Sequence, residues 1–166
     1  MKRLCVVCLL VFLGVFTSQA QAADHRLGGG INYWVAVDDI DVSDVDDDGF
    51  SYLASYQYWP GLIGLELDLE ILPDKYGETA FAPQAFVLVG QGLYAGAGIG
   101  IEYRDSDFAD EPFFALKAGV NLEMLPGIYW DIYATYRFND SADLDNEATD
   151  IDSDTVFLGT IVRIAL

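Results

Sequence analysis

Cysteine and histidine are almost missing from this chain. Its 166 residues include two cysteines, Cys5 and Cys8, and one histidine, His25. Both cysteines lie in an N-terminal segment that we expect to be removed, so the mature protein has no thiol, disulfide or thiolate metal site. The single histidine precedes the first expected strand, where we expect it to be solvated and poorly placed as a general base. We therefore expect no catalytic residue and no bound cofactor.

Basic residues are also scarce. The chain has 8 lysines and arginines against 27 aspartates and glutamates, a formal net charge of −19. Loss of Lys2 and Arg3 with the N-terminal segment leaves six basic residues and a net charge of −21. This balance excludes nucleic acid as a natural partner, because nucleic-acid binding needs cations to neutralise phosphates. Since the same chain is 52% hydrophobic, its charges must be segregated in space.

The N-terminal segment has the three parts of a secretory signal peptide. Met1-Lys2-Arg3 is positively charged, residues 4–16 are mostly apolar, and Ala20-Gln21-Ala22 is a typical cleavage site. The apolar run is shorter than the roughly 20 residues of a membrane-spanning helix, which argues against an anchor. We predict a signal peptide over residues 1–22, Sec-type export, and one mature domain over residues 23–166.

The mature chain alternates apolar and polar residues with the period of a β-strand. From Leu62 to Ile71, aliphatic side chains occupy one face, while Gly64 and a row of acids occupy the other. No helical period of comparable strength follows the signal peptide. The alternation and its punctuation predict eight strands of roughly the length that crosses a bilayer when tilted, near Arg26–Val37, Phe50–Trp59, Leu62–Leu72, Ala80–Gly90, Leu93–Arg104, Phe113–Leu125, Ile128–Phe138 and Thr155–Leu166.

The connections between these strands alternate between short and long. Pro60-Gly61, Gln91-Gly92 and Pro126-Gly127 are signals of tight turns. The other four connections are longer and polar, at residues 38–49, 73–79, 105–112 and 139–154. Short turns at one end and long loops at the other are typical of outer-membrane barrels, in which the long loops are extracellular.

A soluble sandwich or lipocalin-like barrel would instead point the apolar face inward. Two features favour the inverted arrangement. The polar face is rich in glycine, which suits a narrow lumen, and aromatic residues such as Tyr58, Trp59 and Trp130 gather near strand ends, as in the aromatic girdles of membrane barrels. We predict an all-β fold, an eight-stranded antiparallel up-and-down transmembrane β-barrel.

Charged residues on the polar face would then point into the barrel. An eight-stranded barrel has an interior just filled by side chains, and unpaired charges there are costly. We therefore expect a sealed, salt-bridged lumen, with an ion path or gate as the alternative. The predicted lumen network consists of Glu66, Asp68, Glu70, Glu102, Arg104, Lys117, Glu123, Asp131, Arg137 and Arg163.

In its signal peptide, strand count, turn asymmetry and alternating last strand, Val156 to Leu166, the sequence resembles the small eight-stranded outer-membrane barrels of the OmpA-barrel and OmpX-like group. The resemblance implies a monomer in the bacterial outer membrane, in contact with lipid and lipopolysaccharide and assembled by the barrel-insertion machinery. The family usually ends on Phe or Trp, whereas this chain ends on Leu166, so its assembly signal is imperfect.

The resemblance implies a structural or interaction role at the cell surface. A narrow porin-like channel is the alternative, and a soluble ligand-binding barrel or a lipid A-modifying enzyme is less favoured. Lipid A enzymes of this size use a histidine with a serine and a carboxylate, and the position of His25 does not suit that arrangement.

Acidic residues crowd the first long loop in a pattern that begins like a calcium site. Asp44, Asp46, Asp48 and Gly49 have the spacing of the first half of an EF-hand loop. The twelfth position is Ser55 instead of Glu, and no flanking helices are predicted, so this is not an EF-hand. Weak Ca²⁺ or Mg²⁺ binding at Asp44, Asp46 and Asp48 remains a hypothesis, and a solvated acidic fringe is the alternative.

Overall fold

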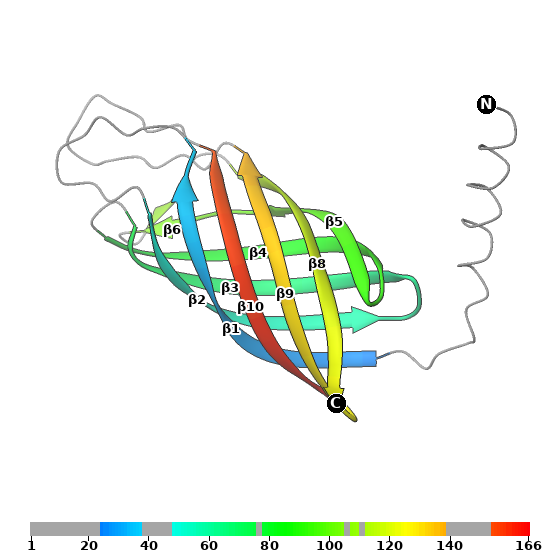
Figure 1. Ribbon diagram of the computed structural model, residues 1–166. Helices are drawn as coiled ribbons and strands as arrows, with labels where there is room; N and C mark the ends of the chain where they lie inside the picture. Colours follow the sequence, from blue (N-terminus) through cyan, green and yellow to red (C-terminus); the bar gives the residue numbers. More distant parts are fainter. Residues whose placement is uncertain (1–23, 38–47, 76–77, 105–106, 110–111, 139–153) are drawn as a thin grey trace, which may run out of the picture.

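The computed structural model describes residues 24–37, 48–75, 78–104, 107–109, 112–138 and 154–166. These residues form a closed antiparallel β-barrel (Figure 1). No helix within those ranges is long and apolar enough to cross a membrane. The predicted signal peptide, residues 1–22, lies outside the described residues.

Eight long strands form the wall, and each pairs with its neighbour along the chain. The barrel closes where the first strand pairs with the last, with Arg26 opposite Ala165 and Ala36 opposite Thr155. Two short strands, β6 and β7, extend the wall at one end. The strands are β1 (Asp24–Ala36), β2 (Asp48–Trp59), β3 (Ile63–Lys75), β4 (Glu78–Gly90), β5 (Leu93–Gly100), β6 (Tyr103–Arg104), β7 (Asp107–Phe108), β8 (Phe113–Leu125), β9 (Ile128–Phe138) and β10 (Thr155–Ala165).

All eight predicted strands are confirmed, with two corrections to their ends. The expected fifth strand is interrupted after Gly100 and resumes as β6. β6 pairs with β7, and β7 lies inside the segment that was predicted to be a polar loop. The long loop predicted at residues 73–79 is wrong, because β3 and β4 extend into it as far as the Lys75–Glu78 pair. The register of β3 and β4 is irregular between Leu72 and Lys75. Strict alternation of apolar and polar residues therefore does not predict this extension.

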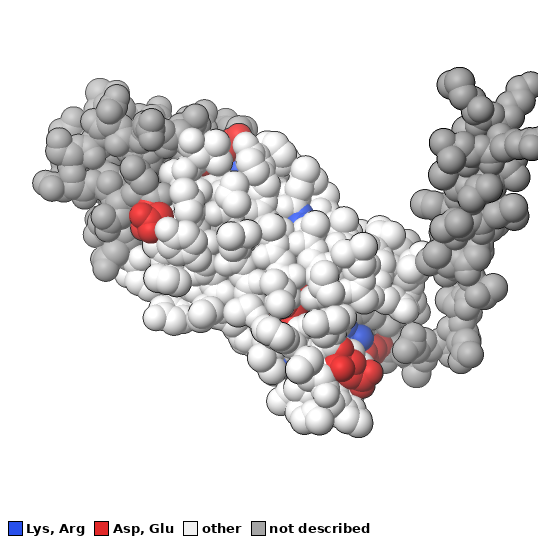
Figure 2. Space-filling view, in the orientation of Figure 1, with Lys and Arg blue, Asp and Glu red and all other residues white. Residues whose placement is uncertain are grey.

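The alternation sorts side chains between two surfaces, as predicted. On β3, Leu65, Leu67 and Leu69 are exposed, while Glu66 and Glu70 are fully buried. Side chains also alternate between exposed and buried along β4, although the sequence alone did not assign the two faces of this strand. Figure 2 shows a barrel wall almost free of charged side chains, with acidic and basic residues gathered near its ends. The described exterior is therefore the apolar surface, as membrane barrels require.

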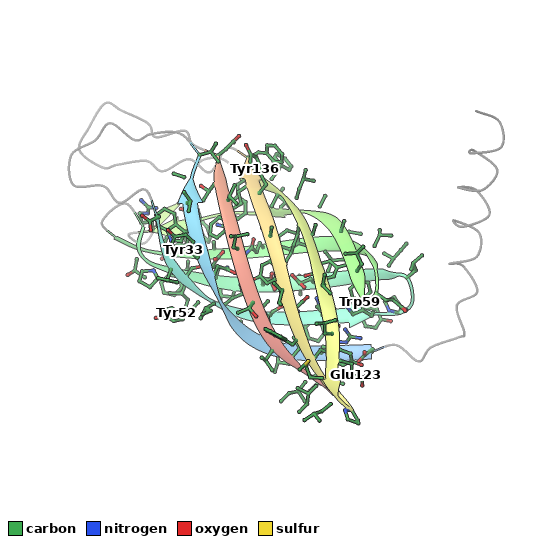
Figure 3. All side chains as sticks on the ribbon, viewed as in Figure 1. Tyr33, Tyr52, Trp59, Glu123 and Tyr136 are labelled. Atoms are coloured by element: carbon green, nitrogen blue, oxygen red, sulfur yellow. The ribbon has the colours of Figure 1, made fainter. Side chains whose placement is uncertain are left out.

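The short turns lie at the end of the barrel that also holds the start of β1 and the end of β10 (Figure 1). Gly90 and Gly127 have positive φ values of 121° and 77° at two of these turns, a conformation that favours glycine. We call this the turn end and the opposite one the loop end. Tyr33, Tyr52 and Tyr136 lie near the loop end, and Trp59 and Glu123 near the turn end (Figure 3).

Trp59 departs from the predicted aromatic girdle. Its side chain is 5% exposed and lies inside the barrel, where its Nε1 donates to Oε1 of Gln57 at 3.0 Å. It shares the inward phase of Leu53, Ser55 and Gln57, and Gly64 on β3 leaves the space that its ring fills. Trp130 does face outward, as expected of a girdle residue.

Candidate functional site

The most distinctive feature of the barrel is a set of ionised side chains buried in its lumen. Three acids come from successive inward positions of β3, and their partners come from β8, β9 and β10 on other parts of the wall. Each of the seven is at least 95% buried. We call this set the lumen network: Glu66, Asp68, Glu70, Lys117, Asp131, Arg137 and Arg163.

Lys117 is the central cation of the lumen network. Its Nζ forms an ion pair with Glu66 and lies 3.1 Å from Oδ2 of Asp68. The ammonium also lies 4.0 Å from the ring centroid of Tyr133 and 4.9 Å from that of Phe86. Carboxylates and aromatic faces together replace the water that a buried ammonium loses.

Arg163 holds the network near the turn end. Its Nη2 donates to Oε2 of Glu66 at 2.8 Å and to Oγ of Ser55 at 3.0 Å, and its Nη1 forms an ion pair with Asp131. Glu66 therefore accepts from both Lys117 and Arg163, while Gln57 donates to it as well. A single carboxylate thus links three other strands to β3.

Arg137 and Glu70 form the corresponding pair nearer the loop end. Glu70 also accepts from Ser51, from Nδ2 of Asn32 at 2.5 Å, and from Nε2 of Gln84 at 3.2 Å. The guanidinium carbon of Arg137 lies 4.4 Å from the ring centroid of Phe113 and 4.0 Å from that of Phe157. The buried charge is therefore enclosed by hydrogen bonds and aromatic rings.

The sequence did not identify the uncharged members of this arrangement. Asn32, Ser51, Gln57 and Gln84 all donate to network carboxylates. They share the inward phase with the predicted charges, so strand period alone could have placed them. Tyr133 extends the arrangement, because its hydroxyl donates to Oδ1 of Asn32 at 2.5 Å.

Three predicted lumen residues lie apart from the network. Glu102 and Arg104 form their own pair at 3.2 Å beside the interruption between β5 and β6. Glu123 is exposed at the turn end, where its carboxylate accepts from the backbone nitrogen of Gly127 at 3.1 Å. Glu123 borders the open turn-end mouth of the barrel together with Trp59 and Asn121, so the prediction that it belongs to the buried network is corrected.

The described residues leave little free space at the centre of the lumen. A cavity of only about 10 Å³ lies among Asp68, Lys117 and Tyr133, roughly the smallest space that holds one water. A larger vestibule of about 180 Å³ opens at the turn end, bordered by Arg26, Trp59 and other residues. The lumen network lies at the narrow cavity, and the wider space lies at the turn end.

The structure describes only one of the three tentative metal ligands. Asp48 begins β2 and accepts a hydrogen bond from the Tyr33 hydroxyl at 2.7 Å. Asp44 and Asp46 lie outside the described residues. Within the described ranges, no group of three or more His, Cys, Asp and Glu side chains could hold a metal ion.

His25 lies within β1 and not before the first strand, which corrects the sequence-based expectation. Its exposed side chain points to the outside of the wall. Its Nδ1 lies 2.7 Å from the Tyr56 hydroxyl, and its ring lies against that of Tyr58 at a tilt of 34°, with centroids 4.8 Å apart. These neighbours are aromatic, unlike the serine and carboxylate of a hydrolytic triad.

Comparison with solved structures identifies the type of barrel. The crystal structure of Neisserial surface protein A (NspA) superposes with a TM-score of 0.64, covering 87% of this chain and 99% of NspA at 14% identity. The chain has the fold of the small eight-stranded outer-membrane β-barrels. Outer membrane protein AlkL, solved by solid-state NMR in lipid bilayers, superposes with a TM-score of 0.55, covering 90% of this chain and 93% of AlkL at 12% identity.

Sequence comparison adds nothing to this structural match. No protein-family model matches the chain, and no curated protein matches it. At 12–14% identity the structural likeness concerns the fold alone. What the barrel does must be argued from its own residues.

Proposed function

We propose that this protein is a sealed outer-membrane barrel that anchors acidic surface loops, with a structural or interaction role in the cell envelope. The observation that carries the proposal is the lumen network, which joins β3 to β8, β9 and β10 through buried ion pairs. A lumen filled in this way stiffens the wall and leaves little room for a diffusing solute. The functional surface is then what the barrel presents outside the membrane.

The outer-membrane location is supported by the apolar exterior and by the fold shared with NspA and AlkL. The expected partners are outer-membrane lipid and lipopolysaccharide, with the barrel-insertion machinery acting during assembly. At the closure between the first and last strands, the backbone nitrogen of Leu166 donates to the carbonyl of His25 at 2.8 Å. We propose a monomer, because a closed barrel has no open strand edge through which to pair.

A non-enzymatic role is part of this proposal, and it is supported by the side chains of the described residues. The network carboxylates are paired and inaccessible, and His25 contacts tyrosines on the outer wall. A catalytic group must lie within reach of a substrate and of its acid–base partner. Neither the interior charges nor His25 meets both conditions.

Cysteine labelling on intact cells tests the location and orientation. Because Cys5 and Cys8 belong to the predicted signal peptide, single-cysteine variants have a clean background. Phe108→Cys places a thiol at the loop end, and Gly61→Cys places one at the turn end, where an added Cβ meets open space. We expect a membrane-impermeant maleimide to label Phe108→Cys on intact cells and Gly61→Cys only after the outer membrane is permeabilised.

Two results would contradict the proposal. Labelling of Gly61→Cys alone on intact cells would reverse the orientation, and recovery of the protein in the soluble fraction would remove it from the membrane. A thermal shift in gel mobility serves as the folding control for both variants.

A further inference from the structure

The outer wall of the barrel contains a long groove that is separate from the lumen network. It has a volume of about 710 Å³ and crosses six strands, from β1 to β8, a size within the roughly 300–1,000 Å³ of small-molecule sites. Outward-facing side chains line it, so it opens to the surroundings of the barrel. Its lining includes His25 and Tyr58 on β1 and β2, Ala85 and Ala97 on β4 and β5, and Phe114 on β8.

Strand register explains why the wall is hollow there. Ala85 lies between Leu67 on β3 and Ile99 on β5, and Ala97 lies beside Val87 on β4. Small side chains on the central strands thus form the floor, while larger aliphatic ones form the sides. Glu66 also borders the groove, but its side chain is fully buried in the lumen, so only its backbone faces the groove.

The polar groups of the groove gather at one end. His25 and Tyr58 are neighbours across β1 and β2 at the turn end of the barrel, beside Tyr56. When the Tyr56 hydroxyl donates to Nδ1 of His25, the hydrogen of the imidazole resides on Nε2 and can be donated to an anion. The rest of the lining is aliphatic or aromatic.

The length and tilt of the groove match one leaflet of a bilayer. Five inter-strand spacings of about 4.8 Å give a groove of about 24 Å. It follows the hydrogen-bonding direction, so with strands tilted by about 40° it rises about 15 Å along the membrane normal, about half of a hydrocarbon core of about 30 Å. A chain that starts at His25 therefore ends near the bilayer midplane.

We propose that this groove is a binding site for a single glycerophospholipid of the periplasmic leaflet, with one acyl chain along the Ala85–Ala97 floor and its phosphate beside His25 and Tyr58. The groove is continuous with the lipid-facing wall, and its single polar end and apolar length fit an amphiphile. The site rests on the proposed membrane location but is independent of the role of the loops.

Native mass spectrometry of the full mature protein tests this site. The protein would be folded in vesicles of phosphatidylethanolamine, extracted in detergent, and compared with a groove-filling variant, Ala85→Leu/Ala97→Leu. We expect one phospholipid to survive on the native barrel and retention to fall by about tenfold in the variant, because the added side chains displace acyl methylenes. The matched control is Ala118→Leu/Ala134→Leu, which makes the same changes at exposed wall positions outside the groove.

The polar end is tested separately. His25→Ala/Tyr58→Phe is expected to lower retention of phosphatidylethanolamine by about fivefold through lost hydrogen bonds, with no effect on diacylglycerol, which has no phosphate. Equal retention by all variants, or no lipid on a demonstrably inserted native barrel, would overturn the site. A dimer that only the groove-filling variant disrupts would also overturn it, by showing that a second copy occupies the groove. Failure of the native protein to insert at all would instead contradict the proposed function.

Discussion

Lys117 on β8 and Asp68 on β3 meet across the lumen, with Nζ 3.1 Å from Oδ2 and both side chains almost completely buried. They lie 49 residues apart in the sequence, and β4 and β5 separate their strands in the wall. The pair therefore links two strands that are not neighbours in the wall through the interior of the barrel.

Removing the Lys117 ammonium should lower the free energy of unfolding of the barrel. Lys117→Met leaves Asp68 buried without its ammonium partner, which typically costs about 3–5 kcal/mol. Urea unfolding of the protein refolded into lipid vesicles would measure the loss. Lys117→Met/Asp68→Asn should recover part of it, because the uncompensated charge is gone while Glu66 keeps Arg163.

The matched control for this prediction is Arg26→Met. Arg26 pairs with Asp24 and donates to Asn121 at the turn end, where both members of the ion pair retain some solvent contact, so its loss should cost less than the loss of the fully enclosed Lys117. Equal effects of Arg26→Met and Lys117→Met would contradict a special role for the lumen network.

Gly159 provides a second test of how tightly the lumen is filled. A Cβ at this position would clash with the Asn32 amide and the Tyr133 ring, which hydrogen-bond to each other. Gly159→Ala should therefore destabilise the barrel by about 1–3 kcal/mol. Gly29→Ala is the control, because its Cβ would point outward and meet nothing nearer than 3.4 Å. Similar unfolding midpoints for both variants would show that the lumen can relax.

The three tryptophans report which face is lipid-exposed. Trp34 and Trp59 are at most 5% exposed inside the barrel, whereas Trp130 on the wall is 39% exposed. Brominated phospholipids should quench the fluorescence of Trp130 strongly and that of the other two weakly. The variant Trp130→Phe should lose most of the quenching. Unchanged quenching in that variant would mean that Trp34 on β1 or Trp59 on β2 contacts lipid, which would contradict their placement inside the barrel.

The acidic loop yields a prediction about divalent cations. If Asp44, Asp46 and Asp48 bind Ca²⁺, binding should be weak, with a Kd of about 10⁻⁴–10⁻³ M, as in extracellular modules. Millimolar Ca²⁺ should then protect the loop from protease, and EDTA should reverse the protection. The variant Asp44→Asn/Asp46→Asn should lose the response. Equal protease protection of the loop with Ca²⁺ and with EDTA would contradict cation binding and favour a solvated acidic loop.

Local sequence period was sufficient to predict the wall and most of the network. The alternation from Leu65 to Glu70 correctly separates exposed leucines from buried acids, because a closed barrel imposes one phase on each strand. Trp59 also follows this alternation, and it was the girdle expectation that failed there, because Gly64 leaves space for its ring inside the barrel. Glu123 lies at the open turn end, where the period does not distinguish a buried from an exposed side chain.

Other features of the site could not be predicted from the sequence. Which base pairs with which acid depends on the stagger of strands distant in the chain, so the Arg163–Glu66 and Arg137–Glu70 pairs needed the structure. The wall groove also depends on register, since it requires Ala85 to lie beside Leu67 and Ile99, and Ala97 to lie beside Val87.

Single-channel conductance in a planar bilayer tests the central claim, that the lumen network seals the barrel. The native protein, shown to be inserted by its heat-dependent gel mobility, should give no discrete current steps across repeated insertions. Lys117→Gly/Arg137→Gly, which removes two of the large side chains from the lumen, should give more frequent openings than the native protein if it inserts. Reproducible steps from the native barrel would contradict the account and make the network the lining of a pore.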